Sequence, residues 1–165
     1  MKKVLSSVAM LSVCALSLAS CASKVSFADF QTKAKEALKK DVEYKTAKIT
    51  GSMVTKTEKN ENKTNISAEC NVNGRVLTPK SLTDTTYSVV VTAFGLGTFG
   101  LTEITGATYY AGSSFKVAYS EEDEDGNKTS SKVEWNEYGL VTVINAKGSG
   151  KDSKATYNLK VSYSK

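Results

Sequence analysis

The acidic run at residues 121–126, EEDEDG, is the first segment whose residue types and spacing could do chemistry. Carboxylates at alternate positions before a glycine are typical of a calcium-binding EF-hand loop. If Glu121 filled the first ligand position, the twelfth would be Lys132, where that loop requires a bidentate glutamate. The flanking segments also have the composition of strands rather than helices. We therefore expect no metal site here.

A β-hairpin accounts for more of the same segment. A three-residue turn over 124–126 would place Gly126 in the left-handed conformation that glycine adopts readily. The resulting cross-strand pairs are Phe115 with Trp135 and Val117 with Val133. A two-residue turn at 125–126 would instead mix the apolar and polar faces of the strands. The pattern favours the three-residue turn.

Residues 95–100, GLGTFG, have the glycine spacing of a dinucleotide-binding loop. That site needs a helix directly after the glycines, because the helix N-terminus holds the pyrophosphate. Residues 101–110 are instead rich in Thr, Gly and Tyr, without helical periodicity. We expect no nucleotide and no other cofactor. The apolar residues in this loop either complete the core or form a lip at the mouth of a ligand groove or against a membrane.

Catalytic groups are hard to find in this chain. Cys70 could act as a nucleophile only with a base beside it, and the sequence contains no histidine. Its alternation with Ile66, Ala68 and Val72 predicts a core position instead. The carboxylates are clustered at the hairpin tip or scattered singly, so no acid–base pair is apparent. We expect no catalytic residues and no enzymatic activity.

The N-terminus has a pattern with a clearer meaning. Lys2 and Lys3 precede an apolar run over 4–18, which is shorter than the roughly 20 residues that span a bilayer. A small-residue cleavage site follows, as in secretory signal peptides. Its last four residues, Leu18-Ala19-Ser20-Cys21, resemble the lipobox of bacterial lipoproteins. The resemblance implies a diacylglyceryl group on the Cys21 thiol and removal of residues 1–20.

The resemblance also implies an address in the cell envelope. A lipid on Cys21 would anchor the chain on the extracytoplasmic side of a membrane, and two or three acyl chains would make the anchor stable. Ala22 resembles the residue that permits sorting to an outer membrane, if the cell has one. Residues 21–25 would be a lipidated tether and 26–165 a single domain. The alternative is an ordinary secreted protein cleaved near Ala19 or Ser20, with Cys21 left as a free thiol.

The charge of the mature chain is mild. Without Lys2 and Lys3, 20 basic residues face 17 acidic ones, which gives a net charge of about +3. An exported location argues against nucleic acid as a partner. We expect the membrane as one partner and an envelope protein or lipid as another.

The residue patterns predict one helix and then strands. Ser26 and Asp29 form a capping-box-like pair at the start of an amphipathic helix from Phe27 to about Lys40. Six segments with strand-like alternation or composition follow, at 44–56, 65–72, 85–94, 105–120, 131–146 and 157–163. The segment 105–120 holds one long strand or two pieces broken at 111–112, and 131–146 is kinked at 138–139.

These elements predict an α+β fold, in which an N-terminal amphipathic helix is followed by a curved, half-barrel-like antiparallel sheet of about six strands. The order is similar to that of the lipoprotein carriers of the LolA and LppX-like type. That resemblance implies a half-barrel around a hydrophobic cavity that carries lipids or lipidated proteins.

Two functions are consistent with these patterns. The first is a non-catalytic, membrane-anchored lipoprotein that binds a protein or envelope component through its sheet face, hairpin tip or edge strand. The second is a small carrier that holds a lipid or other hydrophobic ligand in a groove between helix and sheet. The groove would be lined by Phe27, Phe30 and Leu38, with Phe94, Leu96, Phe99 and Leu101 at its mouth. We favour the first, because small side chains on the strands do not by themselves indicate a void.

Overall fold

A single antiparallel sheet of nine strands dominates the computed structural model, which describes residues 22–165. Cys21 and the segment before it therefore lie outside the described residues. The strands are β1 Ser23–Val25, β2 Thr46–Thr57, β3 Glu61–Asn73, β4 Val76–Pro79, β5 Thr108–Ala111, β6 Phe115–Glu122, β7 Lys128–Trp135, β8 Val141–Ser149 and β9 Ser153–Ser164.

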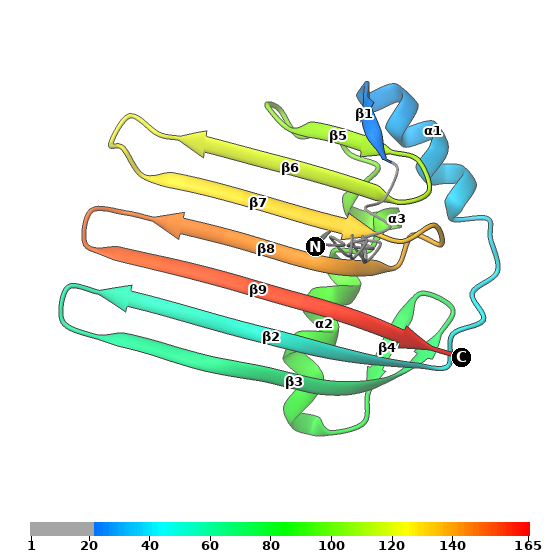
Figure 1. Cartoon of the computed structure of the whole chain (residues 1–165), viewed down its shortest axis with the longest axis horizontal. Coiled ribbons are helices and arrows are strands. Elements are labelled where there is room, and N and C mark those ends of the chain that lie inside the picture. The colour runs from blue at the N-terminus through cyan, green and yellow to red at the C-terminus, as the bar shows by residue number, and fades with distance from the viewer. Residues whose placement is uncertain (1–21) are drawn as a thin grey trace, which may run out of the picture.

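The strand order across the sheet is β1-β5-β6-β7-β8-β9-β2-β3-β4, so β1 and β4 form the two edges (Figure 1). Three long hairpins, β6–β7, β8–β9 and β2–β3, make up the middle, and their tips project from the same end of the sheet (Figure 1). Because the two edge strands do not pair with each other, the sheet is open rather than closed.

The helices are α1 Phe27–Ala37, the 3₁₀ turn η1 Leu82–Asp84, α2 Thr85–Ala93 and the single-turn α3 Leu96–Phe99. In the view of Figure 1, α2 and α3 lie behind the strands, and α1 lies at the upper right beside β1 and β5. Ser26 caps the start of α1, because its hydroxyl accepts the Asp29 N–H at 3.1 Å and donates to the Asp29 carboxylate at 2.8 Å. We refer to the helix-bearing side of the sheet as the covered face.

The hydrophobic core lies between these helices and the covered face. Phe30 of α1 and Trp135 of β7 are fully buried, and their ring centroids are 6.4 Å apart. Phe115 of β6 meets the Phe30 ring edge-on at 5.8 Å. The helices do not cover the hairpin tips, so this part of the sheet is exposed to solvent on both faces.

Several local predictions are confirmed. The predicted helix is α1, which ends at Ala37, about three residues earlier than expected. Strands β6 and β7 pair Phe115 with Trp135 and Val117 with Val133, as the three-residue turn required. Gly126 has the expected positive φ, +77°.

The strand predicted at Thr85–Phe94 is wrong, because this segment forms α2. Its β-branched residues favour a strand locally, but Ser88 and Val91, spaced as on a helix, are buried against the sheet. Tyr87 and Val90 pack against the same core. Tertiary packing here overrides local propensity.

The predicted fold class, a helix followed by a half-barrel of about six strands, is wrong as well. The segment 105–120 forms two strands with a break after Ala111, which was one of the two predicted alternatives. The segment 131–146 also spans two strands, and the very short β1 and β4 were not predicted at all. Residues Ser23–Val25, which were predicted to be part of a tether, pair with β5 as strand β1. The sheet stays open, with helices over part of one face.

Candidate functional site

The seven residues predicted to line a ligand groove lie together in the layer between helices and sheet. Phe30 and Leu96 are fully buried there. The other five are half-buried and pack against the core, namely Phe27, Leu38, Phe94, Phe99 and Leu101. The rings fill much of the layer, since the centroids of Phe94 and Phe99 are 5.0 Å apart. The seven residues thus lie close together, as predicted, but they pack against the core instead of lining an open groove.

A pocket of about 200 Å³ opens beside this layer, and Leu38 and Leu96 are the two groove residues that line it. Its volume is below the roughly 300–1,000 Å³ that is typical of ligand pockets. The Thr92 hydroxyl, which also lines it, is buried without a hydrogen-bond partner. The hydroxyl of Tyr163 donates to the Val141 carbonyl at 2.8 Å, and burial raises the pKa of Tyr163 well above its ordinary value.

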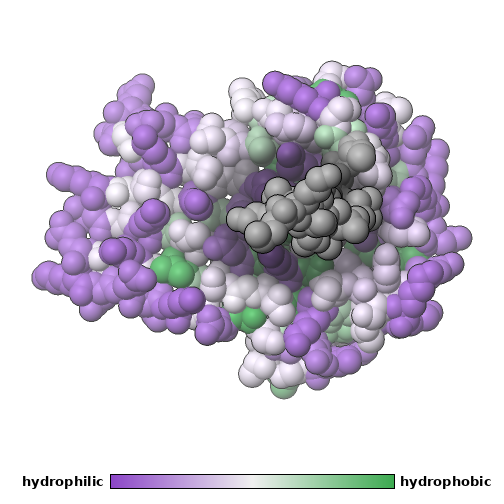
Figure 2. Space-filling model, viewed as in Figure 1, coloured by the Kyte–Doolittle hydropathy of each residue, from purple (hydrophilic) through white to green (hydrophobic). Residues whose placement is uncertain are grey.

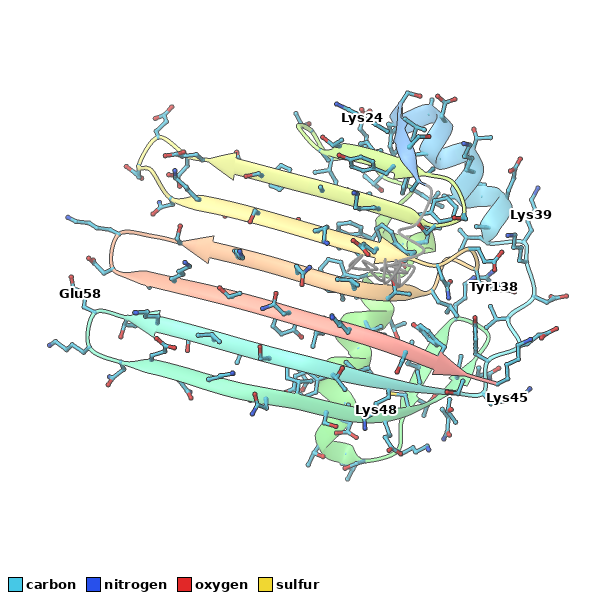
Figure 3. All side chains as sticks on the ribbon, viewed as in Figure 1. Lys24, Lys39, Lys45, Lys48, Glu58 and Tyr138 are labelled. Carbon is cyan, nitrogen blue, oxygen red and sulfur yellow. The ribbon has the colours of Figure 1, made fainter. Side chains whose placement is uncertain are left out.

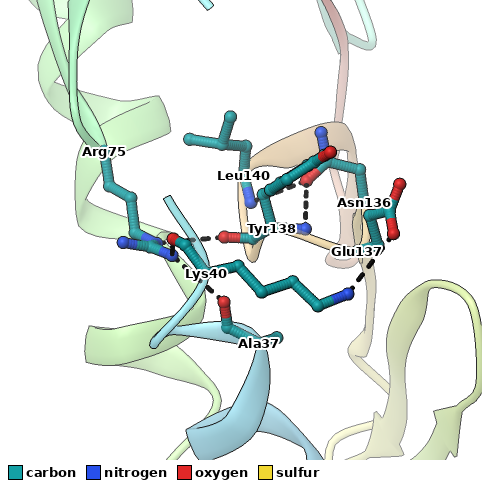
Figure 4. Close-up of polar contacts among 7 residues, drawn as sticks. All are labelled: Ala37, Lys40, Arg75, Asn136, Glu137, Tyr138 and Leu140. Carbon is teal, nitrogen blue, oxygen red and sulfur yellow. Dashed lines mark hydrogen bonds and ion pairs between the residues drawn. The ribbon is translucent and has the colours of Figure 1, made fainter. Parts of the chain in front are cut away.

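Arg75 lies at the rim of this pocket and joins three segments of the chain (Figure 4). Its Nε donates to the Tyr138 carbonyl at 3.0 Å. Its Nη2 donates to the carbonyls of Ala37 at 3.1 Å and Lys40 at 2.8 Å, which satisfies acceptors at the end of α1. The guanidinium is therefore occupied by structural contacts.

The other motifs from the sequence have structural roles. The Asp123 carboxylate accepts the N–H groups of Asp125 and Asn127 and the side-chain amide of Asn127. The Asn127 amide does most to hold the pKa of Asp123 below its ordinary value. Within residues 22–165, no group of three metal-binding side chains comes together. Cys70 is fully buried, and burial raises the pKa of its thiol.

The face of the sheet opposite the helices has a different character. No element within residues 22–165 covers it, and the part visible in Figure 2 is mostly purple and white, that is, hydrophilic or intermediate. We call it the open face. The strand registers place these ten lysines on it: Lys24, Lys48, Lys56, Lys63, Lys116, Lys128, Lys132, Lys147, Lys154 and Lys160.

The open face carries far fewer acidic groups. Its four glutamates are Glu61, Glu69, Glu122 and Glu134, so ten positive and four negative charges leave a net charge of +6. This face is therefore more basic than residues 22–165 as a whole, which carry 20 basic and 17 acidic residues, so the part of this chain outside the open face is net acidic. Lys24 and Lys48, labelled in Figure 3, show that the lysines extend over both halves of the sheet.

Each of the four glutamates already has a lysine partner. The ion pairs are Lys56–Glu61, Lys80–Glu69, Lys128–Glu122 and Lys132–Glu134, at 2.9–3.6 Å. The Lys116 ammonium lies 3.8 Å from the centre of the Tyr110 ring, which is a cation–π contact. On the open face, six exposed lysines have no ion-pair partner within the described chain: Lys24, Lys48, Lys63, Lys147, Lys154 and Lys160.

Five of these six lysines surround a row of short polar side chains on β8, β9, β2 and β3. Asn145 lies opposite Asn158, which lies opposite Ser52, and Ser52 lies opposite Asn65. Neighbouring strands are about 4.8 Å apart, so the row offers a regular line of polar donors and acceptors across the sheet. We call these four residues the amide row.

This arrangement suits an extended acidic ligand. Unpaired ammonium groups attract carboxylate, phosphate or sulfate groups, and amide side chains can hydrogen-bond to hydroxyls or carbonyls between them. The sequence-based predictions named a sheet face as one possible binding surface but none of these residues, because they followed the apolar positions of each strand. The signal lay in the polar positions that alternate with the apolar ones along each strand, such as Asn158 and Lys160 in β9.

No helix within residues 22–165 is long and apolar enough to cross a membrane. Comparison of the chain with family models, with curated proteins and with solved structures found no match.

Proposed function

We propose that this chain is a non-catalytic, membrane-anchored bacterial lipoprotein whose open face binds an acidic component of the cell envelope. The observation that carries the proposal is the set of unpaired lysines around the amide row. An acidic glycan or a comparable anionic polymer has the charge and the length to contact several of them together.

The energetics favour a polymer over a small anion. One exposed lysine contributes little to binding, because water and salt screen its charge. Several lysines on one rigid sheet act together on one chain, since every further contact of a bound polymer is intramolecular. The nine-stranded sheet supplies that rigidity, and the six unpaired lysines supply the contacts.

The proposed anchor fits the position of the sheet relative to the N-terminus. Strand β1 begins two residues after Cys21 and is paired with β5. A lipid on Cys21 would therefore hold the β1 edge near the membrane, on the extracytoplasmic side of the inner membrane or on the outer membrane if the cell has one. Strands β8, β9, β2 and β3, with most of the unpaired lysines, lie toward the other edge.

The interior supports this function better than a carrier. The helix–sheet layer is packed with the aromatic side chains described above, and the pocket beside it holds only about 200 Å³. An acyl chain would have to displace these side chains, whereas the open face needs no rearrangement.

The proposal is tested by titrating the full chain, purified in detergent, with polygalacturonate as a carboxylated glycan and with dextran as its neutral counterpart. We expect binding to polygalacturonate alone, weakening as salt is raised, because the lysines are exposed and screened. Equal binding to dextran, binding that is independent of salt, or a preference for single-stranded DNA over the glycan would contradict the proposal.

A further inference from the structure

The sheet has one long stretch of edge that no other strand covers within residues 22–165. Strand β4 is the edge strand, but it pairs only with residues 70–73 of β3. The preceding part of β3, residues 61–69, pairs with β2 alone. A strand of this length with one unpaired side is a template for strand addition, which proteins normally shorten or cover.

The hydrogen bonds of Glu69 show which backbone groups face outward. Its N–H donates to the Asp84 carboxylate at 3.4 Å, and its carbonyl accepts the Lys80 N–H at 2.9 Å, so both point away from β2. Outward groups alternate along an antiparallel strand. The register with β2 is unbroken from Glu61 to Asn71. Lys63, Asn65 and Ser67 therefore each present an unpaired N–H and carbonyl along this edge.

The surroundings of this edge differ on its two sides. On the covered face, η1 and the first turn of α2 follow β4, and α2 extends past β3 in Figure 1. Leu82 of η1 is 94% exposed and Val89 of α2 is 60% exposed, which is unusual for large apolar side chains. On the open face, Lys63 is exposed and has no ion-pair partner within the described chain. The edge is thus apolar on one side, whereas on the other Lys63 is the unpaired charge, because Glu61 and Glu69 are paired with Lys56 and Lys80.

We infer that residues 63–67 of β3 bind an extended segment of a partner protein by β-strand addition. The segment would carry acidic side chains toward the open face and apolar side chains toward Leu82 and Val89. The alternation of side chains along a strand supplies this pattern directly. Backbone hydrogen bonds give such complexes their affinity, and the two rows of side chains give their specificity. This segment and the proposed polymer would share Lys63, but only the segment would use the backbone groups of the β3 edge.

A single substitution can test the edge without breaking the β2–β3 ladder. The Asn65 N–H points away from β2, so Asn65→Pro removes no hydrogen bond of that ladder, and edge strands tolerate proline. Asn65→Ala keeps the N–H and serves as the matched control. The probe is a short capped peptide of alternating glutamate and valine, and its counterpart alternates lysine and valine.

The full chain in detergent should bind the glutamate–valine peptide and not the lysine–valine peptide. We expect Asn65→Pro to bind the peptide at least roughly tenfold more weakly than Asn65→Ala, because only the alanine variant keeps the backbone N–H. Hydrogen exchange on the unmodified chain gives a second readout, in which the peptide should protect the amides of Lys63, Asn65 and Ser67. Exchange on that chain does not depend on how the proline variant folds.

Three results would overturn the inference. These are absence of binding by the unmodified chain, equal binding by Asn65→Pro when it is folded, and protection of other amides only. Self-association of the full chain that Asn65→Pro abolishes would also overturn it, in favour of a second copy as occupant. Replacing Lys147 and Lys160 with glutamine should leave peptide binding unchanged, which separates this site from the one proposed for acidic polymers.

Discussion

The indole N–H of Trp135 donates a 2.7 Å hydrogen bond to the carbonyl oxygen of Phe94. Trp135 lies on β7 in the middle of the sheet, and Phe94 is the C-cap residue that directly follows α2. The bond therefore fixes the end of one helix against the sheet, at the fully buried Trp135 side chain.

Trp135→Phe removes this bond and leaves the Phe94 carbonyl without that donor. An unsatisfied buried acceptor costs about 1–3 kcal/mol, so we expect the free energy of unfolding to fall by at least that much. Tyr110→Phe, on the open face, should change it by less than about 0.5 kcal/mol. Urea unfolding of the two variants provides the comparison. Equal stability of both would contradict the role of Trp135.

Gly51 and Gly148 are strand glycines that should respond oppositely to alanine. A Cβ on Gly51 would lie 1.9 Å from the Asn158 carbonyl oxygen, so β2 and β9 would have to move apart. Around Gly148 no atom lies within 4 Å of the added carbon. We expect Gly51→Ala to lower the free energy of unfolding by about 2–3 kcal/mol or more. Gly148→Ala should leave it unchanged or raise it by about 0.4–1 kcal/mol.

Thermal unfolding of both alanine variants tests this contrast. A Gly51→Ala variant as stable as the unmodified chain would show that β9 does not approach β2 so closely.

Tyr163 makes stability depend on pH in the alkaline range. Burial raises its pKa in the folded chain, whereas in the unfolded chain the phenol titrates near pH 10. The unfolded state therefore loses this proton first. The stability that Tyr163 contributes is complete below about pH 10 and is lost as the pH rises above that value.

Tyr163→Phe should cost about 0.5–1.5 kcal/mol at neutral pH, because the bond to the Val141 carbonyl is lost. Above about pH 10 its stability should fall less steeply than that of the unmodified chain. Denaturant unfolding across the alkaline range measures both effects. Parallel pH profiles for the two chains would show that Tyr163 does not stay protonated in the fold.

Lipidation can be assigned by comparing two cysteines. Cys21→Ser should abolish incorporation of labelled palmitate and move the full chain from the membrane fraction to the soluble one. Cys70→Ala should keep both the label and the membrane location, because Cys70 is buried in the core. Label retained in Cys21→Ser would contradict the proposed anchor.

The sequence was most informative where local pattern and tertiary environment agree. Ile66, Ala68 and Cys70 alternate on β3 and are all buried, and the paired apolar residues of β6 and β7 set the hairpin register. The sequence was misleading where the local pattern and the tertiary environment conflict. Val91 belongs to a β-branched run, yet it lies on a helix because the covered face needs a packing partner at that place.

The candidate site could not be derived in the same way. Lys48, Lys147 and Lys160 are more than ten residues apart in sequence, and only the pairing of β8, β9 and β2 brings them to one face. The short β1 and β4 carry too few residues for an alternation to be seen. The order of the strands in the sheet, which the sequence pattern does not reveal, therefore determines both the set of lysines on the open face and the unpaired edge of β3.

The central claim, that the open face binds an acidic envelope polymer, is tested most directly with two variants of equal net charge. One replaces Lys48, Lys147 and Lys160 on the open face with glutamine. The other replaces Lys33, Lys35 and Lys39, which belong to α1 and the residues just after it. The measurement is the affinity of each full chain for polygalacturonate at low salt. We predict a loss of roughly tenfold or more for the first variant and little change for the second. Equal affinity of the two variants would show that net charge, and not the open face, holds the polymer, and would contradict the proposed function.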